Sequence, residues 1–498
     1  MHFVVLIIIV KELLQSLAES SHYKSLLAKV QAQNSTTVGG LAGASLSAVV
    51  ANLYTHTHRP LLVLLPDKEE SAYVLNDLET LVGEQRVLFF PDSYRRPYQI
   101  EDTDNANVLL RAEVLHQLSH STKPLIVVSY PEALFEKVIT RKQLEQNTLK
   151  ITKGDSLTLE FLNEVLFSYQ FNRTDFVTEP GEFSVRGGIV DIFSFSNNEP
   201  YRIEFFGNEV ESIRTFDVES QLSTAQLSQI IIIPNVENKE SDEVRQSFLE
   251  YISSQTLFIA KDIASLDQKI DKLFAKATDI YQKLANEVKR TAPEELYCQT
   301  EDLLTQANRL QSIHIGISQP ELIFLTTPQP SFNRQFELLI AYLNEKHAEG
   351  YQNYILCGTE QQAKRFHDIF EEMEQKVAYQ TVQLSLHAGF VDNELKINVF
   401  TDHQIFERYY KFQLKNGYAK KQAITLKELM QLEVGDYVTH IDHGIGKFAG
   451  LQKIEVEGKQ QEAIKLIYGD RDVLFVSIHA LHKITKYNGK DGKPPKIY

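Results

Sequence analysis

The run Leu61-Leu62-Val63-Leu64-Leu65, closed by Pro66-Asp67, is the stretch that decides the fold. Five consecutive apolar residues that end at a turn signal are typical of a fully buried strand. Similar short runs occur at residues 87–90 and 125–128, and helical patterns occupy residues 71–82 and 107–118. Strands that alternate with helices in this way predict a parallel α/β sheet.

The pattern changes after this first region. Residues 161–166 form a helical pattern, whereas residues 201–206 and 209–216 alternate apolar and polar side chains, as half-buried strands do. We therefore predict a small α+β insertion here. Residues 230–233 read as a further buried strand, and residues 239–311 read as charged and largely helical.

A second compact α/β unit is predicted after a boundary marked by Pro328 and Pro330. Residues 354–357 and 397–400 are its strand candidates. A helix starting at Gln361 separates them. Its apolar face has the i, i+3, i+4, i+7 spacing of an amphipathic helix and consists of Phe366, Ile369, Phe370 and Met373.

From Val434 onward the pattern is all-β, with short alternating strands separated by glycines. Residues 463–468 and 473–476 flank Gly469-Asp470-Arg471-Asp472 as the two strands of a hairpin would. The sequence therefore predicts a small C-terminal barrel, and residues 406–422 are polar and basic enough to be a linker.

Composition excludes several classes of protein. The chain has 498 residues, 43% of them hydrophobic, and a formal net charge of −15. This charge argues against nucleic-acid binding by the whole surface. Two cysteines, Cys298 and Cys357, cannot build a disulfide framework and fit a cytoplasmic protein. The apolar run at residues 3–10 is too short to span a membrane, and either a buried β segment or an upstream extension outside the fold explains it.

A degenerate phosphate loop is predicted at Gly40-Leu41-Ala42-Gly43-Ala44-Ser45-Leu46-Ser47. A working loop has Gly and then Lys before the final Ser or Thr. Here Ser45 replaces the Gly and Leu46 replaces the Lys, which would hold the phosphates by its charge. We therefore expect Gly40, Gly43 and Ser47 to shape a loop that packs a helix on a sheet, with no bound cofactor.

Other polar patterns are weaker. Arg95-Arg96, beside Tyr94 and Tyr98, could touch nucleic acid, but a solvated loop explains the pair better. His440, Asp442 and His443 have no further ligand motif near them, so no metal site is predicted. Arg173 and Arg186 lie beside aromatic residues as interface anchors do, although pattern alone favours structural salt bridges. No catalytic constellation stands out.

Six stretches are distinctive in their order and spacing: residues 89–92 (FFPD), 178–193 (TEPGEFSVRGGIVDIF), 201–206 (YRIEFF), 213–217 (IRTFD), 401–406 (TDHQIF) and 440–448 (HIDHGIGKF). Through them the chain resembles the N-terminal half of the bacterial transcription-repair coupling factors (Mfd). The resemblance covers essentially the whole chain.

This resemblance implies a multidomain α/β architecture. A UvrB-like module is expected first, as a degenerate RecA-like domain split around an insertion that binds UvrA. A small α/β domain follows, and then an SH3/Tudor-like barrel, similar to CarD, that holds the RNA polymerase β subunit. The implied domains are residues 1–131 and 218–328 for the split domain, 132–217 for the insertion, 329–415 for the small domain, 416–430 for the linker and 431–498 for the barrel.

The resemblance also implies functional residues. The UvrA surface would include Arg173, Phe183, Arg186 and Phe193. In the barrel, residues 451–456 alternate as an edge strand would, and Leu451, Lys453 and Ile454 would contact the polymerase by strand addition. The alternative is that Ile454 faces the barrel core.

In the family an ATP- and Mg-dependent translocase on double-stranded DNA follows these domains, so we expect a non-catalytic scaffold here. A UvrB-like ATPase acting on damaged DNA is the alternative. Leu46 argues against it, and residues 91–124 leave no room for the aromatic hairpin of UvrB. A regulator that works only through a CarD-like barrel is a third reading, but it leaves the first 330 or so residues without a role.

Overall fold

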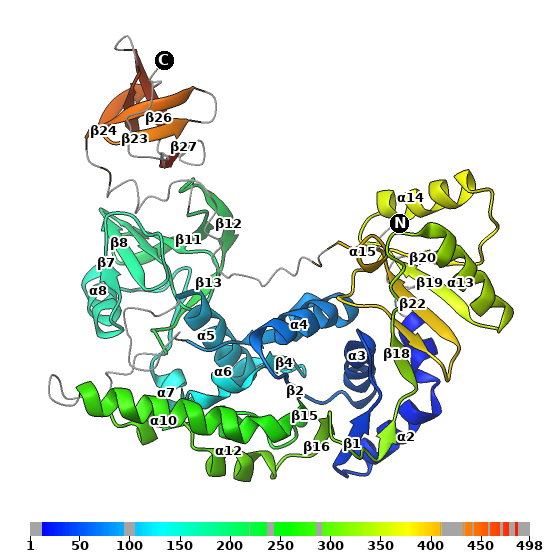
Figure 1. The fold of residues 1–498 in the computed structure, drawn as a ribbon. Helices are drawn as coiled ribbons and strands as arrows, with labels where there is room; N and C mark the ends of the chain where they lie inside the picture. Colours follow the sequence, from blue (N-terminus) through cyan, green and yellow to red (C-terminus); the bar gives the residue numbers. More distant parts are fainter. Residues whose placement is uncertain are drawn as a thin grey trace. The chain divides into compact units, whose positions relative to one another are not determined.

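The computed structural model divides into two compact units, residues 1–141 with 237–414 and residues 142–236 with 415–498 (Figure 1). Within them it describes residues 12–93, 105–218, 220–236, 244–284, 291–408, 410, 432, 434–440, 443–456, 459–468, 472–477 and 484–486. The N-terminal apolar run, the Arg95-Arg96 pair and most of the expected linker lie outside these residues. None of the described helices is long and apolar enough to cross a membrane.

The first unit contains the predicted parallel sheet. In the described residues this sheet has seven strands in the order β17-β1-β16-β15-β2-β4-β3, and every neighbouring pair is parallel. The strands are β1 (Thr36–Gly39), β2 (Leu61–Leu64), β3 (Val87–Phe90), β4 (Ile126–Ser129), β15 (Leu257–Lys261), β16 (Ser312–Ile315) and β17 (Leu322–Ile323).

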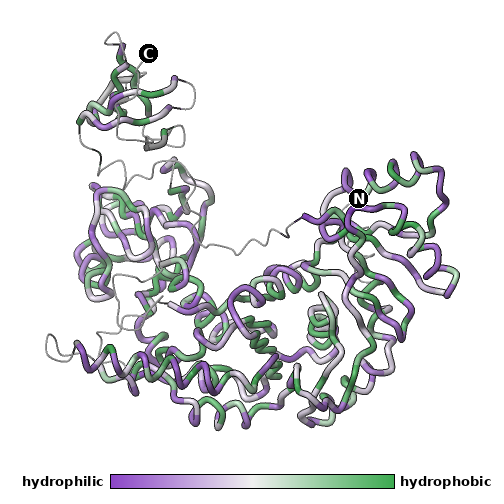
Figure 2. The backbone as a smooth tube through the Cα atoms, viewed as in Figure 1, coloured by the Kyte–Doolittle hydropathy of each residue, from purple (hydrophilic) through white to green (hydrophobic). Residues whose placement is uncertain are grey.

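One strand near the middle of this sheet was not predicted. The segment that contains β15 was expected to be largely helical, yet β15 lies between β2 and β16. Its apolar core, Leu257 to Ala260, is only four residues long and fully enclosed. A short apolar run cannot be assigned by periodicity alone. The helical part of the prediction is confirmed by α10 (Leu266–Leu284), whose hydropathy alternates along its length (Figure 2).

Helices cover the sheet where the sequence predicted them. They are α3 (Ser45–Thr57), α4 (Lys68–Val82) and α5 (Asn105–His120). Asp67 caps α4 by accepting a hydrogen bond from the Glu70 N–H at 2.9 Å. Both α4 and α5 contact β3. Shorter helices complete this part: α2 (Ser21–Gln31), α6 (Pro131–Phe135), α7 (Arg141–Gln146, at the junction with the second unit), α9 (Phe248–Tyr251), α11 (Pro293–Leu296) and α12 (Thr300–Ala307).

The same unit contains the second predicted α/β element, which we call the small α/β part. Its sheet has the order β18-β21-β22-β19-β20, in which β22, β19 and β20 are parallel. Phe366 and Phe370 of α14 are buried in its core, as predicted. Its elements are β18 (Thr326–Pro328), α13 (Phe336–Ala348), β19 (Gln352–Leu356), α14 (Glu360–Glu372), β20 (Gln380–Val382), β21 (Phe390–Asp392), β22 (Ile397–Thr401) and α15 (Asp402–Ile405).

The second unit begins with the α+β insertion. Its six described strands have the order β12-β11-β10-β9-β8-β7. They are β7 (Asn172–Arg173), β8 (Glu182–Arg186), β9 (Ile189–Ile192), β10 (Tyr201–Phe206), β11 (Glu209–Phe216) and β12 (Ser223–Leu227), with α8 (Leu159–Ser168) as the expected helix. The sheet thus continues past the expected boundary at residue 217. β13 (Gln229–Ile232) pairs with β6 (Leu149–Thr152) in a separate antiparallel ladder rather than in the parallel sheet.

The C-terminal region forms an antiparallel sheet with the order β26-β25-β24-β23-β27. The hairpin of β25 and β26 is confirmed. The described residues do not include a pairing of β26 with β27, so closure into a barrel stays a prediction. The strands are β23 (Tyr437–His440), β24 (Gly444–Val456), β25 (Lys459–Ile467), β26 (Val473–Ser477) and β27 (Ile484–Lys486).

The first unit should lose stability in mild acid because of His116. Burial lowers the pKa of this histidine from 6.5 to about 4. A histidine with a lowered folded-state pKa protonates first in the unfolded chain, so stability is lost as pH falls below 6.5. We expect roughly 2 kcal/mol to be lost between about pH 7 and pH 5. Urea unfolding across this range measures the slope. His116→Gln should flatten it and His367→Gln, an exposed histidine on α14 of the same unit, should not; an equal slope in both variants contradicts this assignment.

Candidate interaction surfaces

The predicted degenerate phosphate loop joins β1 to α3. Gly40 and Gly43 have φ angles of 72° and 53°, which L side chains rarely adopt. A Cβ at position 40 would come within 1.9 Å of the Phe324 carbonyl oxygen. The glycines of this loop are therefore required by its backbone geometry, whatever the loop binds.

The side chains of the loop face inward. Leu46 is 6% exposed and belongs to the core, so no charge stands at the lysine position. Ser45 and Ser47 are also buried, and the Ser47 hydroxyl donates to the Asp77 carboxylate at 2.8 Å. That hydroxyl occupies the position that binds Mg²⁺ in a working phosphate loop. Absence of a cofactor here stays a prediction, which this use of Ser47 favours.

Two of the C-terminal histidines lie close to each other. The rings of His440 and His443 lie 4.8 Å apart, and Asp442 lies outside the described residues. Among the residues that the structure does describe, no group of three His, Cys, Asp or Glu side chains could hold a metal ion.

The insertion contains an ionic cluster centred on Asp191, a fully buried residue of β9. Asp191 stands opposite Arg202 of β10 in the strand register. Arg202 donates to both carboxylate oxygens, at 2.7 Å from Nε and 2.9 Å from Nη2. Arg186, at the end of β8, binds the same carboxylate. The cluster is therefore one buried anion between two cations, with one positive charge in excess.

The two arginines of this cluster differ in exposure. The Arg202 side chain is 16% exposed, whereas that of Arg186 is 41% exposed. Arg202 lies over the Phe216 ring at 4.4 Å, and Arg186 lies over the Phe176 ring at 5.1 Å. Arg202 is thus a structural residue. Arg186 is held in place by Asp191 and Phe176 while its outer part remains available to a partner.

The other residues expected at the UvrA surface fall into two groups. Arg173 is exposed on β7, the outer strand of the described sheet. Phe183 and Phe193 are each 0% exposed. These two rings fill the core of the insertion, so their side chains cannot contact a partner in this structure. We keep Arg173 and Arg186 as candidates and assign the two phenylalanines to the core.

The region expected to contact RNA polymerase lies in β24. Residues 444–447 of this strand pair with β23, whereas residues 451–456 pair only with β25 in the described structure. This half of β24 therefore has one backbone edge without a described partner strand. Leu451 is 42% exposed. Ile454 stands opposite Gln461 in the register, and the side chains of Lys453 and Ile454 lie outside the description.

Sequence reasoning missed further exposed apolar side chains in this sheet. Val473 and Phe475 of β26 are 45% and 41% exposed. They alternate with Leu474 and Val476, of which Val476 belongs to the core. The alternation was visible in the sequence, but it did not show which of the two faces is covered.

Two parts of the chain match the models of known protein families. Residues 149–237 match the model of the UvrB interaction domain, and residues 432–488 match the CarD-like/TRCF RID domain. The transcription-repair-coupling factor of Bacillus subtilis is 24% identical over 564 residues, which cover 96% of this chain and 47% of that protein. The chain is a relative of the transcription-repair-coupling factors.

Other coupling factors match over the same extent. Those of Staphylococcus epidermidis and Staphylococcus aureus are each 24% identical, over 97% and 96% of this chain and 47% of their own lengths. The chain thus spans about half the length of the curated relatives it matches. These matches confirm the resemblance to the coupling factors that the sequence motifs indicate.

Asp191 should matter far more for stability than Arg186 does. Asp191→Ala leaves the buried Arg202 without its counter-ion, which should cost about 3 kcal/mol or more. Arg186→Ala removes a partly exposed partner and should cost less than about 1 kcal/mol. Chemical denaturation of the two variants measures both values. Similar losses in the two variants would contradict the assignment of Arg202 as structural and Arg186 as peripheral.

Proposed function

We propose that this chain is a non-catalytic scaffold of transcription-coupled nucleotide-excision repair, which recruits UvrA and binds the β subunit of RNA polymerase. The observation that carries this proposal is the presence of both family matches in one chain, at residues 149–237 and 432–488. A protein with both regions can connect a polymerase to the repair machinery. A CarD-like regulator would need only the second region.

The finer architecture is part of the same proposal. We assign a degenerate RecA-like domain to residues 1–141 and 237–328. The insertion, expected at residues 132–217, is assigned to 142–236 because β12 belongs to its sheet. The small α/β domain is assigned to 329–415, a linker to 416–430 and an SH3/Tudor-like barrel to 431–498. The protein is expected to act in the cytoplasm.

Enzymatic activity is not expected from these residues, because Leu46 provides no charge for phosphates. ATP-dependent movement on double-stranded DNA would belong to the part of the relatives that this chain does not match. The UvrB-like ATPase remains the alternative, and it would require a nucleotide to bind at residues 40–47, where leucine replaces the lysine.

The UvrA contact would depend on arginine. Arg186 carries an excess positive charge and is oriented by Asp191, so its guanidinium is preorganised for an acceptor on the partner. Arg173 is a second exposed guanidinium, on an outer strand of the same sheet. A partner surface with carboxylate or backbone acceptors fits these two residues.

We expect Arg173→Ala with Arg186→Ala to weaken UvrA binding by about tenfold or more, as truncation of interface arginines does. Binding of purified UvrA to immobilised protein gives the affinity. Lys150→Ala, an exposed charge in the same unit, is the matched control and should bind normally. Unchanged UvrA binding by the double variant would refute this surface.

The polymerase contact would use strand addition. The edge of β24 at residues 451–456 that has no partner strand in the described part of the chain would offer backbone groups to a strand of the partner, and Leu451, Lys453 and Ile454 would flank or anchor that strand. Such binding depends little on charge, so it should persist at salt concentrations that screen exposed ion pairs.

Ile454→Arg should abolish binding to the polymerase β subunit while the melting temperature stays within a few degrees, because an anchor residue contributes to the interface and not to the core. Pull-down and thermal unfolding test this together. Val473→Arg, on the opposite end of the sheet, should leave binding intact. Loss of binding only in Val473→Arg would assign the contact to β26, and unfolding of Ile454→Arg would show that Ile454 is a core residue.

A further inference from the structure

A short segment of the small α/β part, residues 387–389, lies against the degenerate phosphate loop at residues 40–47. The Ala44 N–H donates to the Ala388 carbonyl at 3.0 Å, and the Ala42 N–H donates to the Thr326 hydroxyl at 2.9 Å. A Cβ on Gly43 would come within 2.4 Å of the Gly389 carbonyl oxygen. Backbone N–H groups of such a loop are the groups that cradle phosphate. Here oxygen atoms of the same chain occupy them.

The segment is fixed to the loop through Asp77 of α4, which is fully buried. One Asp77 oxygen accepts a hydrogen bond from the His387 N–H at 2.8 Å, and the other lies 2.6 Å from His387 Nδ1. The second oxygen also accepts the hydrogen bond from Ser47. The Tyr73 ring stacks on the imidazole with centroids 5.5 Å apart. Ser47 is thereby connected to the small α/β part through one carboxylate.

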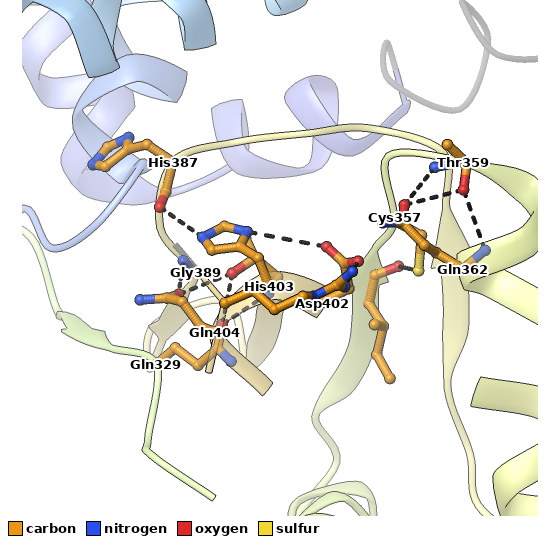
Figure 3. Close-up of polar contacts among 12 residues, drawn as sticks. Gln329, Cys357, Thr359, Gln362, His387, Gly389, Asp402, His403 and Gln404 are labelled. Carbon is orange, nitrogen blue, oxygen red and sulfur yellow. Dashed lines mark hydrogen bonds and ion pairs between the residues drawn. The ribbon is translucent and has the colours of Figure 1, made fainter. Parts of the chain in front are cut away.

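On its other side the segment is anchored in the small α/β part itself (Figure 3). His403 Nε2 lies 3.0 Å from the His387 carbonyl oxygen. The Gly389 N–H donates to Gln404 at 2.7 Å, and the Gln329 N–H donates to the Gly389 carbonyl at 3.2 Å. Gln329 lies near the start of the small α/β part, and His403 and Gln404 lie near its end. Because all three hold the segment, separation of the segment from the loop requires the small α/β part to move with it.

We infer that the loop at residues 40–47 is an internal docking site, in which residues 387–389 occupy the place that a nucleotide's phosphates take in a working loop. Two consequences follow. The parallel sheet and the small α/β part undergo local unfolding together, as one cooperative unit. Residues 387–389 exclude a nucleotide from the loop, in addition to the absence of the lysine. Restoration of the lysine alone therefore does not create a nucleotide site. Neither consequence depends on the proposed partners.

Hydrogen exchange with mass spectrometry tests the first consequence in the full chain. Asp77→Asn and His387→Ala each weaken the contact from one side. We expect amide exchange in residues 40–47 and in residues 384–391 to accelerate together, by about tenfold or more, because a loss of 1.4 kcal/mol changes an opening equilibrium tenfold. His367→Ala, an exposed histidine on α14 of the same part, should change neither segment. Acceleration in only one segment, or in neither, overturns the inference.

The second consequence is tested with Mg-ATP as the probe. The double variant Ser45→Gly with Leu46→Lys restores the phosphate-loop pattern. We expect it to show no saturable ATP binding by calorimetry while far-ultraviolet circular dichroism confirms that it is folded. Saturable binding by this variant overturns the occupancy argument. If the variant is unfolded, protection of residues 384–391 in the wild-type chain provides the test: protection should be unchanged by excess Mg-ATP, and altered protection overturns the inference.

Discussion

The first unit depends on the hydrogen bonds that the buried carboxylate of Asp77 accepts. It receives hydrogen bonds from Ser47 on one side and from His387 on the other, while it is itself withdrawn from water. A buried charge of this kind is tolerated only where its hydrogen bonds are complete. Its position therefore requires the loop, α4 and the small α/β part to be assembled at the same time. Parallel sheets usually leave their carboxyl edge open for a ligand, and here the chain provides its own cover at that edge.

The insertion also contains a buried carboxylate whose polar contacts are complete, that of Asp191. Asp191 is buried and paired with two arginines, but only one of them, Arg202, is enclosed with it. The buried pair fixes the strands, and the excess charge is carried outward by Arg186. A surface arginine without such a partner would lose more side-chain entropy on binding. Under the proposed function, stability and recognition would share one carboxylate, with Arg202 serving the first and Arg186 the second.

The sequence predicted most of the elements that position these sites. The strands β2, β3 and β4 were predicted because each is a short apolar run followed by a turn signal, and α14 was predicted from the spacing of Phe366 and Phe370. β15 was missed because four apolar residues inside a charged, helical region carry no period. Phe183 and Phe193 were expected at a surface because they flank Arg186 and the motif around it, but strand register buries both rings. The contact of His387 with Asp77 joins residues 310 positions apart, and no local pattern predicts such a pairing.

The glycines of the loop have a consequence for how such chains are recognised. Gly40 and Gly43 adopt left-handed backbone angles, and Gly40 also lies against a carbonyl group, so the fold requires them without any phosphate. A pattern search that gives weight to these glycines would assign ATP binding to this chain. Within the sequence pattern, the residue that indicates a nucleotide site is the lysine, because its charge has no role in the backbone geometry. Where leucine replaces it, as at position 46, the spacing of glycines indicates the backbone conformation of the loop and not nucleotide binding.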